Sequence, residues 1–313
     1  MIDSVLLQLC QVLTILVFAP LLHGFISTCE EKVQRGQGPS IWQPYRDLWK
    51  LLHKELVVPQ TASWVFWAAP IIAFTAMLIV PMLIPVLTNY PLPLSNMGDI
   101  LGGGLILTLA VFGILLAGMD SGHPYGGLGS SREAMLSILA EPTLIMVFVG
   151  ITLLAKSMLP FVVNHLLVRQ PDIFWSPAHL FLVAAFFILL TVETGRLPIH
   201  SAIPYEIYMI GEARILDYSG PLLALLKWAS WMKQAILYTI FLNVLTIPWG
   251  LSAQGTAMGA FGALGALLGK WALVGLLMVG VETAQSRLRF YRYQEPLALS
   301  FLMTVLAVVA RQI

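Results

Sequence analysis

The sequence predicts an all-α polytopic membrane protein with eight transmembrane helices. Hydrophobic residues make up 58% of the 313 residues and charged residues only 11%, with a mean hydropathy of +0.84. Soluble domains contain about 25% charged residues, so this chain has too little charge to cover a globular surface in water. Continuous apolar runs of about twenty residues, long enough to cross a bilayer as helices, recur along the chain. A transmembrane β-barrel would instead show alternating segments of about ten residues.

The apolar runs define the spans in order. They cover residues 3–26, 63–88, 100–119, 142–163, 178–195, 221–249, 257–282 and 296–311. No soluble domain fits between them, which predicts a single membrane domain over residues 1–313. The first residues, MIDSVLLQL, lack a basic stretch, so we expect the first run to remain as a helix and not to be cleaved as a signal peptide.

Lysine and arginine residues determine the expected orientation, because loops rich in them stay in the cytoplasm. The odd-numbered loops, about residues 27–62, 120–141, 196–220 and 283–295, carry Lys32, Arg35, Arg46, Lys50, Lys54, Arg132, Arg196, Arg214, Arg287, Arg289 and Arg292. The even-numbered loops carry Arg169. The odd-numbered loops are therefore expected in the cytoplasm, with the chain N-out and C-out.

The first cytoplasmic loop contains an amphipathic segment, GPSIWQPYRDLWKLLHKE. Its apolar residues recur with helical spacing from Ile41, and its charged residues fall largely elsewhere on the helix. The aromatic residues suit the headgroup layer, which predicts an interfacial helix between the first and second spans. The alternative is a docking surface or a chamber shared with other subunits. The candidates for that role in this segment are Trp42, Tyr45, Arg46, Asp47 and Lys50.

The third cytoplasmic loop, GMDSGHPYGGLGSSREAMLSILAEP, ends on a carboxylate. Ser130 is expected to cap a helix that begins near Arg132, which is a further docking candidate. Glu141 then stands at the membrane edge, just before Pro142. A carboxylate there is costly unless it is paired, so Glu141 is a functional candidate. An interfacial Glu solvated by headgroups is the alternative.

The fifth cytoplasmic loop, TVETGRLPIHSAIPYEIYMIGEARILDYSG, carries most of the candidates. Glu193 and Arg196 share a helical face, where a structural salt bridge is the plain interpretation. Glu206, Glu212 and Asp217 follow among bulky apolar residues. Clustered carboxylates with coupled pKa values are what a proton relay requires. We therefore prefer a buried polar channel mouth to a solvated loop.

Ionisable residues also lie inside the later spans. Lys233 is deep in the sixth span and Glu282 closes the seventh, so both are further candidates for a proton path. Lys227 and Lys270 lie nearer span ends and are expected to extend toward the interface. The two cysteines of the chain are too few for an iron–sulfur cluster and match no zinc pattern. We predict no metal site and no catalytic residue in this chain.

Together these segments resemble subunit 1 of the respiratory complex I family. They are most similar to its counterpart in formate hydrogenlyase and other membrane-bound group 4 nickel–iron hydrogenases. The motifs that carry the resemblance are GPSIWQPYRDLWKLL, GMDSGHPYGGLGSSREAMLSILAEP, ETGRLPIHSAIPYEIYMIGEARILDYSG, the MKQ at 232–234 and the ETAQSRLRF at 282–290. They appear in the same order along essentially the whole chain.

The resemblance implies a non-redox subunit that anchors a peripheral arm and holds the entrance of a proton path. By this resemblance Glu141, Glu193, Glu206, Glu212 and Asp217 belong to that entrance. The chain departs from the family at His200, where an Asp is common. A histidine titrates near neutrality and can still relay protons. The departure makes quinone binding doubtful.

The resemblance also implies partners and cofactors. The nickel–iron centre and iron–sulfur clusters are expected in hydrogenase-like large and small subunits and iron–sulfur subunits on the cytoplasmic side, with antiporter-like subunits in the membrane. None of these cofactors is expected on this chain, and the membrane is a bacterial or archaeal cytoplasmic membrane. The net charge of +1 argues against nucleic acid. The alternatives are the quinone-site subunit of a respiratory NADH dehydrogenase, a secondary ion transporter and a membrane scaffold. A transporter would show two related halves with broken helices, and none are visible in the sequence.

Overall fold

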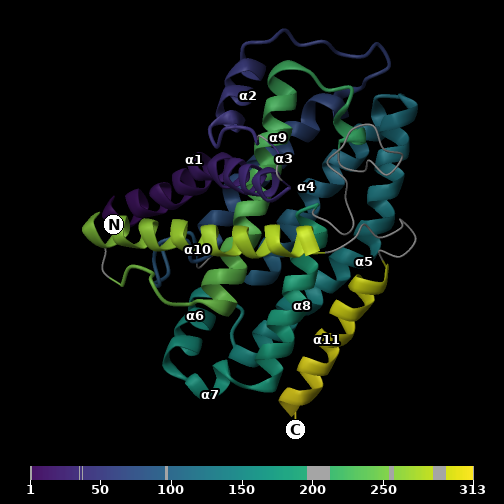
Figure 1. Cartoon of the computed structure of the whole chain (residues 1–313). Helices are drawn as coiled ribbons and strands as arrows, with labels where there is room; N and C mark the ends of the chain where they lie inside the picture. The colour runs from purple at the N-terminus through teal and green to yellow at the C-terminus, as the bar shows by residue number, and fades with distance from the viewer. Residues whose placement is uncertain are drawn as a thin grey trace.

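The computed structural model describes residues 2–34, 36, 38–95, 98–195, 212–253, 257–284 and 294–312. The secondary-structure elements in these ranges are helices (Figure 1). The all-α class predicted from the apolar composition is therefore confirmed. Three candidate residues, Arg196, His200 and Glu206, lie outside the described residues.

The order of the helices follows the order of the apolar runs. The helices are α1 (Ile2–Val33), α2 (Gln43–Leu52), α3 (Trp64–Leu83), α4 (Ile100–Asp120), α5 (Pro124–Ala155), α6 (Pro160–Arg169), α7 (Pro171–Phe174), α8 (Pro177–Glu193), η2 (Ala213–Ile215), α9 (Gly220–Thr239), η3 (Ile240–Thr246), α10 (Ala257–Ala284) and α11 (Gln294–Gln312). Proline stands in the first turn of α5 to α9, where its missing N–H is not needed. At the start of α4, Asp99 accepts a hydrogen bond from the Gly102 N–H at 2.6 Å.

The described helices include six that are long and apolar enough to cross a bilayer, namely α1, α3, α4, α5, α10 and α11. These six correspond to six of the predicted spans, so the chain is a multi-pass membrane protein. The other two predicted spans correspond to α8, which is apolar but has 17 residues, and to α9, which carries Lys227 and Lys233. Their crossing of the membrane stays a prediction.

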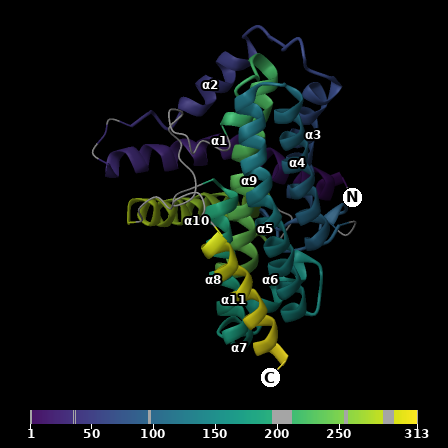
Figure 2. The same cartoon turned by 90° about the vertical axis from the view of Figure 1, so that its right-hand side faces the viewer.

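The centre of the bundle is α9 together with η3. Every residue from 234 to 245 is buried. α9 packs against α1, α2, α3 and α8, while α5 packs against α4, α8 and α11. Figures 1 and 2 show α1 and α10 lying across α9 and not along it. Any polar side chain on this part of α9 is therefore enclosed by protein.

The predicted amphipathic helix is present as α2, which lies beside α1 and the beginning of α9 (Figure 2). Leu48 is buried, whereas Trp42 and Trp49 are 59% and 70% exposed. Gly24 of α1 allows the close approach, because a Cβ at this position would collide with the carbonyl oxygen of Ile41. The exposed tryptophans agree with the predicted interfacial position, which itself stays a prediction.

The beginning of α5 differs from the pattern predicted from the sequence. The expected cap at Ser130 is wrong, because the helix begins seven residues earlier than expected, at Pro124, with His123 as its N-cap. Ser130 is fully buried inside the helix. A Cβ on Gly129 would lie 2.8 Å from the Cβ of Ala213, so η2 packs directly on these turns. This tertiary contact stabilises helical turns that a glycine-rich sequence would not form alone.

The end of α5 also differs from the prediction. The helix continues through Pro142 and ends at Ala155, eight residues before the predicted end of the fourth span. Lys156 then adopts a left-handed conformation with φ 52°, and the short helices α6 and α7 follow. A proline inside a helix is tolerated where neighbouring helices enclose it. Glu141 therefore stands inside a continuous helix and not at the end of a loop.

Candidate functional site

A cavity of about 640 Å³ opens among α1, α2, α4, α5, α8, η2, α9 and α10. It brings together five of the eight residues predicted for a proton path. These are Glu141, Glu193, Glu212, Lys233 and Glu282. Asp47, predicted for docking or a chamber, also lines the cavity. Residues from helices far apart in the sequence thus share one polar space.

Glu193 and Lys233 form the shortest ion pair in this cavity among the described residues. The Lys233 Nζ lies 2.7 Å from the Glu193 Oε2, and the two side chains are 17% and 11% exposed. Glu193 ends α8 and Lys233 lies in the middle of α9, so the pair also ties these helices together. The sequence favoured Arg196 as the partner of Glu193, and the structure gives it Lys233.

Glu141 adds a second carboxylate to this pair. It lies on α5, within electrostatic range of Glu193, Lys233 and Glu133. Two carboxylates beside one ammonium group leave one negative charge uncompensated. A proton that binds here neutralises that charge, so the group can hold and release a proton.

The lining of the cavity is strongly acidic as a whole. It includes eight carboxylates, from Glu30, Glu31, Asp47, Glu133, Glu141, Glu193, Glu212 and Glu282. It also includes three basic side chains, from Lys227, Lys233 and Arg214. An enclosed space with this excess of negative charge attracts cations and repels anions.

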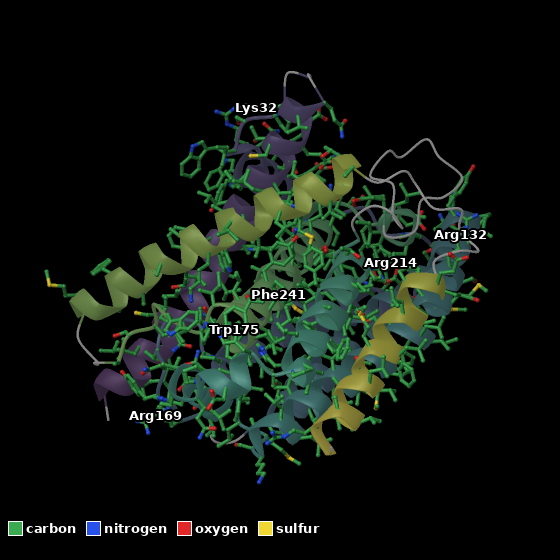
Figure 3. The ribbon with its side chains drawn as sticks, turned by 60° about the horizontal axis from the view of Figure 1, so that its bottom comes forward. Lys32, Arg132, Arg169, Trp175, Arg214 and Phe241 are labelled. Carbon is green, nitrogen blue, oxygen red and sulfur yellow. The ribbon has the colours of Figure 1, made fainter. Side chains whose placement is uncertain are left out.

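The sequence analysis missed Glu133 and Arg214 as cavity residues. The Arg214 Nη1 lies 3.2 Å from the Glu133 Oε1, and both side chains are less than one-fifth exposed. In Figure 3, Arg214 and Arg132 lie on the same side of the molecule, far from Arg169. Glu133, Ser137 and Glu141 recur at i, i+4 and i+8 and all line the cavity. That spacing was the signal in the sequence.

A hydrogen-bonded row continues from the cavity into the centre of the bundle. The His23 ring stacks on Trp231 at 5.2 Å, and its Nδ1 lies 3.4 Å from the Gln234 Oε1. Gln234 donates from Nε2 to the Tyr238 hydroxyl at 3.2 Å. Gln234 is 6% exposed and Tyr238 is fully buried. The polar row thus extends about one turn of α9 beyond the cavity wall.

Asp217 does not line this cavity, although it was predicted for the same path. Its Oδ1 lies 4.0 Å from the His123 Nδ1, at the beginning of α5. The neighbouring Tyr218 donates to the Phe66 carbonyl oxygen at 3.0 Å. Burial raises the pKa of the Tyr218 hydroxyl above its usual range, and Asp120 and Asp217 raise it further. Tyr218 therefore stays neutral and holds this second cluster in place.

The remaining docking candidates lie around α2 and on α5. Tyr45 donates to the carbonyl oxygen of Val17 in α1, and burial raises the pKa of its hydroxyl. Arg46 and Lys50 are exposed beside Trp42. Arg132 is half-buried on α5. These positions are accessible to other chains, and their role stays a prediction.

A bundle of apolar helices around an acidic cavity defines a multi-pass membrane protein with charged groups inside its helical bundle. The family described as NADH dehydrogenase matches residues 7–311. The chain belongs to this family.

Two curated proteins of Escherichia coli (strain K12) are similar over nearly the whole chain. Formate hydrogenlyase subunit 4 is 32% identical over 287 residues, which cover 91% of this chain and 92% of that protein. Hydrogenase-4 component C is 30% identical over 305 residues, covering 97% and 94%. An NADH-quinone oxidoreductase subunit of Anaplasma marginale (strain St. Maries) is 29% identical over 215 residues, covering 58% and 60%. The resemblance seen in the sequence motifs is confirmed.

The fold is also similar to a chain of a solved complex. That complex is the membrane-bound sulfane sulfur reductase, an archaeal respiratory membrane complex. The TM-score is 0.77 at 21% identity, covering 96% of this chain and 99% of the other. At this identity the match establishes the shared fold.

Proposed function

We propose that this chain is the membrane subunit of an energy-converting oxidoreductase related to complex I, of the membrane-bound hydrogenase or formate hydrogenlyase type. The similarity to formate hydrogenlyase subunit 4 and hydrogenase-4 component C along more than nine-tenths of the chain supports this assignment. In this role the chain anchors the peripheral redox arm and carries the entrance of a proton path. The nickel–iron centre and iron–sulfur clusters belong to partner subunits, and this chain binds none of them.

The proposed topology has eight spans in a bacterial or archaeal cytoplasmic membrane. The charged loops face the cytoplasm, both termini face outward, and α2 lies in the interface. The partners on the cytoplasmic side are hydrogenase-like and iron–sulfur subunits, and those within the membrane are antiporter-like subunits. The excess of basic residues in the odd-numbered loops supports this arrangement.

One observation carries the assignment of a proton path. Five candidate residues predicted from separate segments meet in one cavity, where Glu141 joins the ion pair of Glu193 and Lys233. Such a group binds a proton reversibly, as a relay must. The acidic lining supplies cations to it from the cytoplasm.

A second candidate function is the quinone-site subunit of a respiratory NADH dehydrogenase. Its support is the similarity to NADH-quinone oxidoreductase subunits over more than half of the chain. Mass spectrometry of the purified complex separates the two. A nickel–iron large subunit selects the hydrogenase assignment, whereas NADH-oxidising subunits select the other.

The proton path is tested by Glu141→Gln in the purified complex, reconstituted in proteoliposomes with a pH-sensitive dye inside. Turnover is driven by the electron donor of the subunits found by mass spectrometry. We expect the variant to assemble and to translocate fewer protons, because the amide keeps the shape of the side chain but cannot release a proton. Glu55→Gln, an exposed position outside the cavity, is the control. Full translocation by Glu141→Gln at normal turnover would remove this carboxylate from the path.

A further inference from the structure

At the end of the bundle away from the cavity, α9 continues into the π-helix η3, Ile240–Thr246. π-helices are rare and are frequent at functional sites. The helix ends at Thr246, and its final carbonyl groups have no partner in a following turn. Asn243, in the middle of η3, is fully buried. It lies nine residues beyond Gln234, which is about 14 Å along a helix.

Lys270 of α10 extends to this π-helix and not to the interface, as the sequence had suggested. Its Nζ donates to the Asn243 Oδ1 and to the Ile247 carbonyl oxygen, both at 2.8 Å. Both partners are neutral oxygen atoms. The negative end of a helix dipole stabilises a cation, so the end of η3 favours the charged form of Lys270. The ammonium group keeps its positive charge uncompensated.

A network of buried amides fixes Asn243 in place. Its Nδ2 donates to the carbonyl oxygens of Pro85 at 2.8 Å and Val86 at 3.1 Å. Asn164 of α6 donates to the carbonyl oxygens of Asn243 at 2.6 Å and Pro248 at 3.0 Å. These bonds join α6, η3 and the segment after α3. The position of the Lys270 charge is therefore set by a rigid part of the molecule.

The stretch between the polar row and Lys270 offers no step for a proton. Residues 240–242 are Ile, Phe and Leu, all buried. Phe241 lies 6.0 Å from Phe186 and 5.9 Å from Phe187, measured between ring centroids. Figure 3 places Phe241 between Arg214 on one side and Arg169 on the other. An apolar layer of this kind excludes water.

We propose that Lys270, held by Asn243 and the end of η3, is an electrostatic barrier that closes the bundle to cations opposite the acidic cavity. A fixed positive charge in a low-dielectric region repels protons and metal cations, as basic residues do in selective pores. This inference rests on the proposed function, since a barrier matters only if the cavity takes up protons. Protons that enter the cavity are thereby kept from crossing this chain directly.

The test measures passive proton leak in proteoliposomes of the purified complex, without electron donor, under a potassium diffusion potential. Lys270→Gln keeps hydrogen-bond donors but removes the charge, so we expect a several-fold faster leak. Lys270→Arg keeps the charge and should leak like the unmodified complex. Lys156→Gln, an exposed lysine at the end of α5, is the matched control and should also leave the leak unchanged.

A second variant guards against a folding defect at Lys270. Asn243→Asp keeps the size of the side chain and places a carboxylate against the ammonium group, which neutralises its charge, so the leak should rise again. An unchanged leak in Lys270→Gln and Asn243→Asp would overturn the barrier. Lower translocation and turnover in Lys270→Gln without extra leak would also overturn it, by placing Lys270 on the path itself. Because the leak is measured without turnover, its result is independent of the result for Glu141→Gln.

Discussion

The pair of Glu193 and Lys233 shows how one contact can serve both stability and function. The pair joins α8 to α9 at 2.7 Å and stands in a cavity that gathers further carboxylates. Removing one partner of a fully buried ion pair costs about 3–5 kcal/mol, because the other charge is left alone. The cost here is smaller because the cavity is open to water at one end.

We expect Lys233→Met to lower the melting temperature of the purified complex, since Glu193 loses its partner while Glu141 remains nearby. Combining Lys233→Met with Glu193→Gln should recover most of the loss, because no unpaired carboxylate remains at that position. Proton translocation should stay impaired in the double variant. A double variant as unstable as Lys233→Met alone would mean that packing, and not charge, is what Lys233 contributes.

Candidate residues were predictable from the cost of charge in a membrane, but their partners were not. Glu141, Glu193 and Glu282 were chosen because carboxylates in apolar surroundings need compensation, and each lines the cavity. The partner of Glu193 comes from a helix 40 residues away in the sequence, a distance that spacing rules cannot bridge. Lys270 was wrongly expected to reach the interface, because the π-helix that holds it leaves no mark in the hydropathy pattern.

Among the elements, α2 was predictable and α5 was not. The spacing of apolar residues gave the helical stretch of α2, since its amphipathic pattern is local. The first turns of α5 depend on contact with η2 across Gly129, which only the folded molecule provides. The expected break before Pro142 therefore did not occur.

The position of α2 depends on a single glycine of α1. A Cβ on Gly24 would collide with the carbonyl oxygen of Ile41 and press on the Pro44 ring. We expect Gly24→Ala to displace α2 and to speed amide exchange in Gln43–Leu52, measured by hydrogen-exchange mass spectrometry. Gly262→Ala in α10 adds a methyl group where the structure has no atom within 4 Å, so it should leave exchange in α2 unchanged.

Equal exchange in α2 for the Gly24→Ala variant and the unmodified protein would contradict this account. It would mean that α1 and the start of α2 can move apart without loosening the helix. Leu48 is the buried contact that such a displacement would expose first.

In the whole molecule the two ends of the bundle have opposite character. The acidic cavity lies toward one end, and the buried network of Asn164, Asn243 and Lys270 lies toward the other. An apolar layer around Phe241 separates them. A bundle built this way accepts cations from one side only, which suits a chain that receives protons and passes them to a neighbouring subunit.

The direction of this asymmetry in the membrane is given by the basic loops, and it can be measured. Lys54 follows α2 and Asp172 lies in α7, and both are exposed at positions that the proposed topology places on opposite sides. In a background with Cys10→Ser and Cys29→Ser, we expect Asp172→Cys to react with an impermeant thiol reagent in intact cells. Lys54→Cys should react only after permeabilisation. The reverse pattern would invert the topology, and the acidic cavity would then open to the outside.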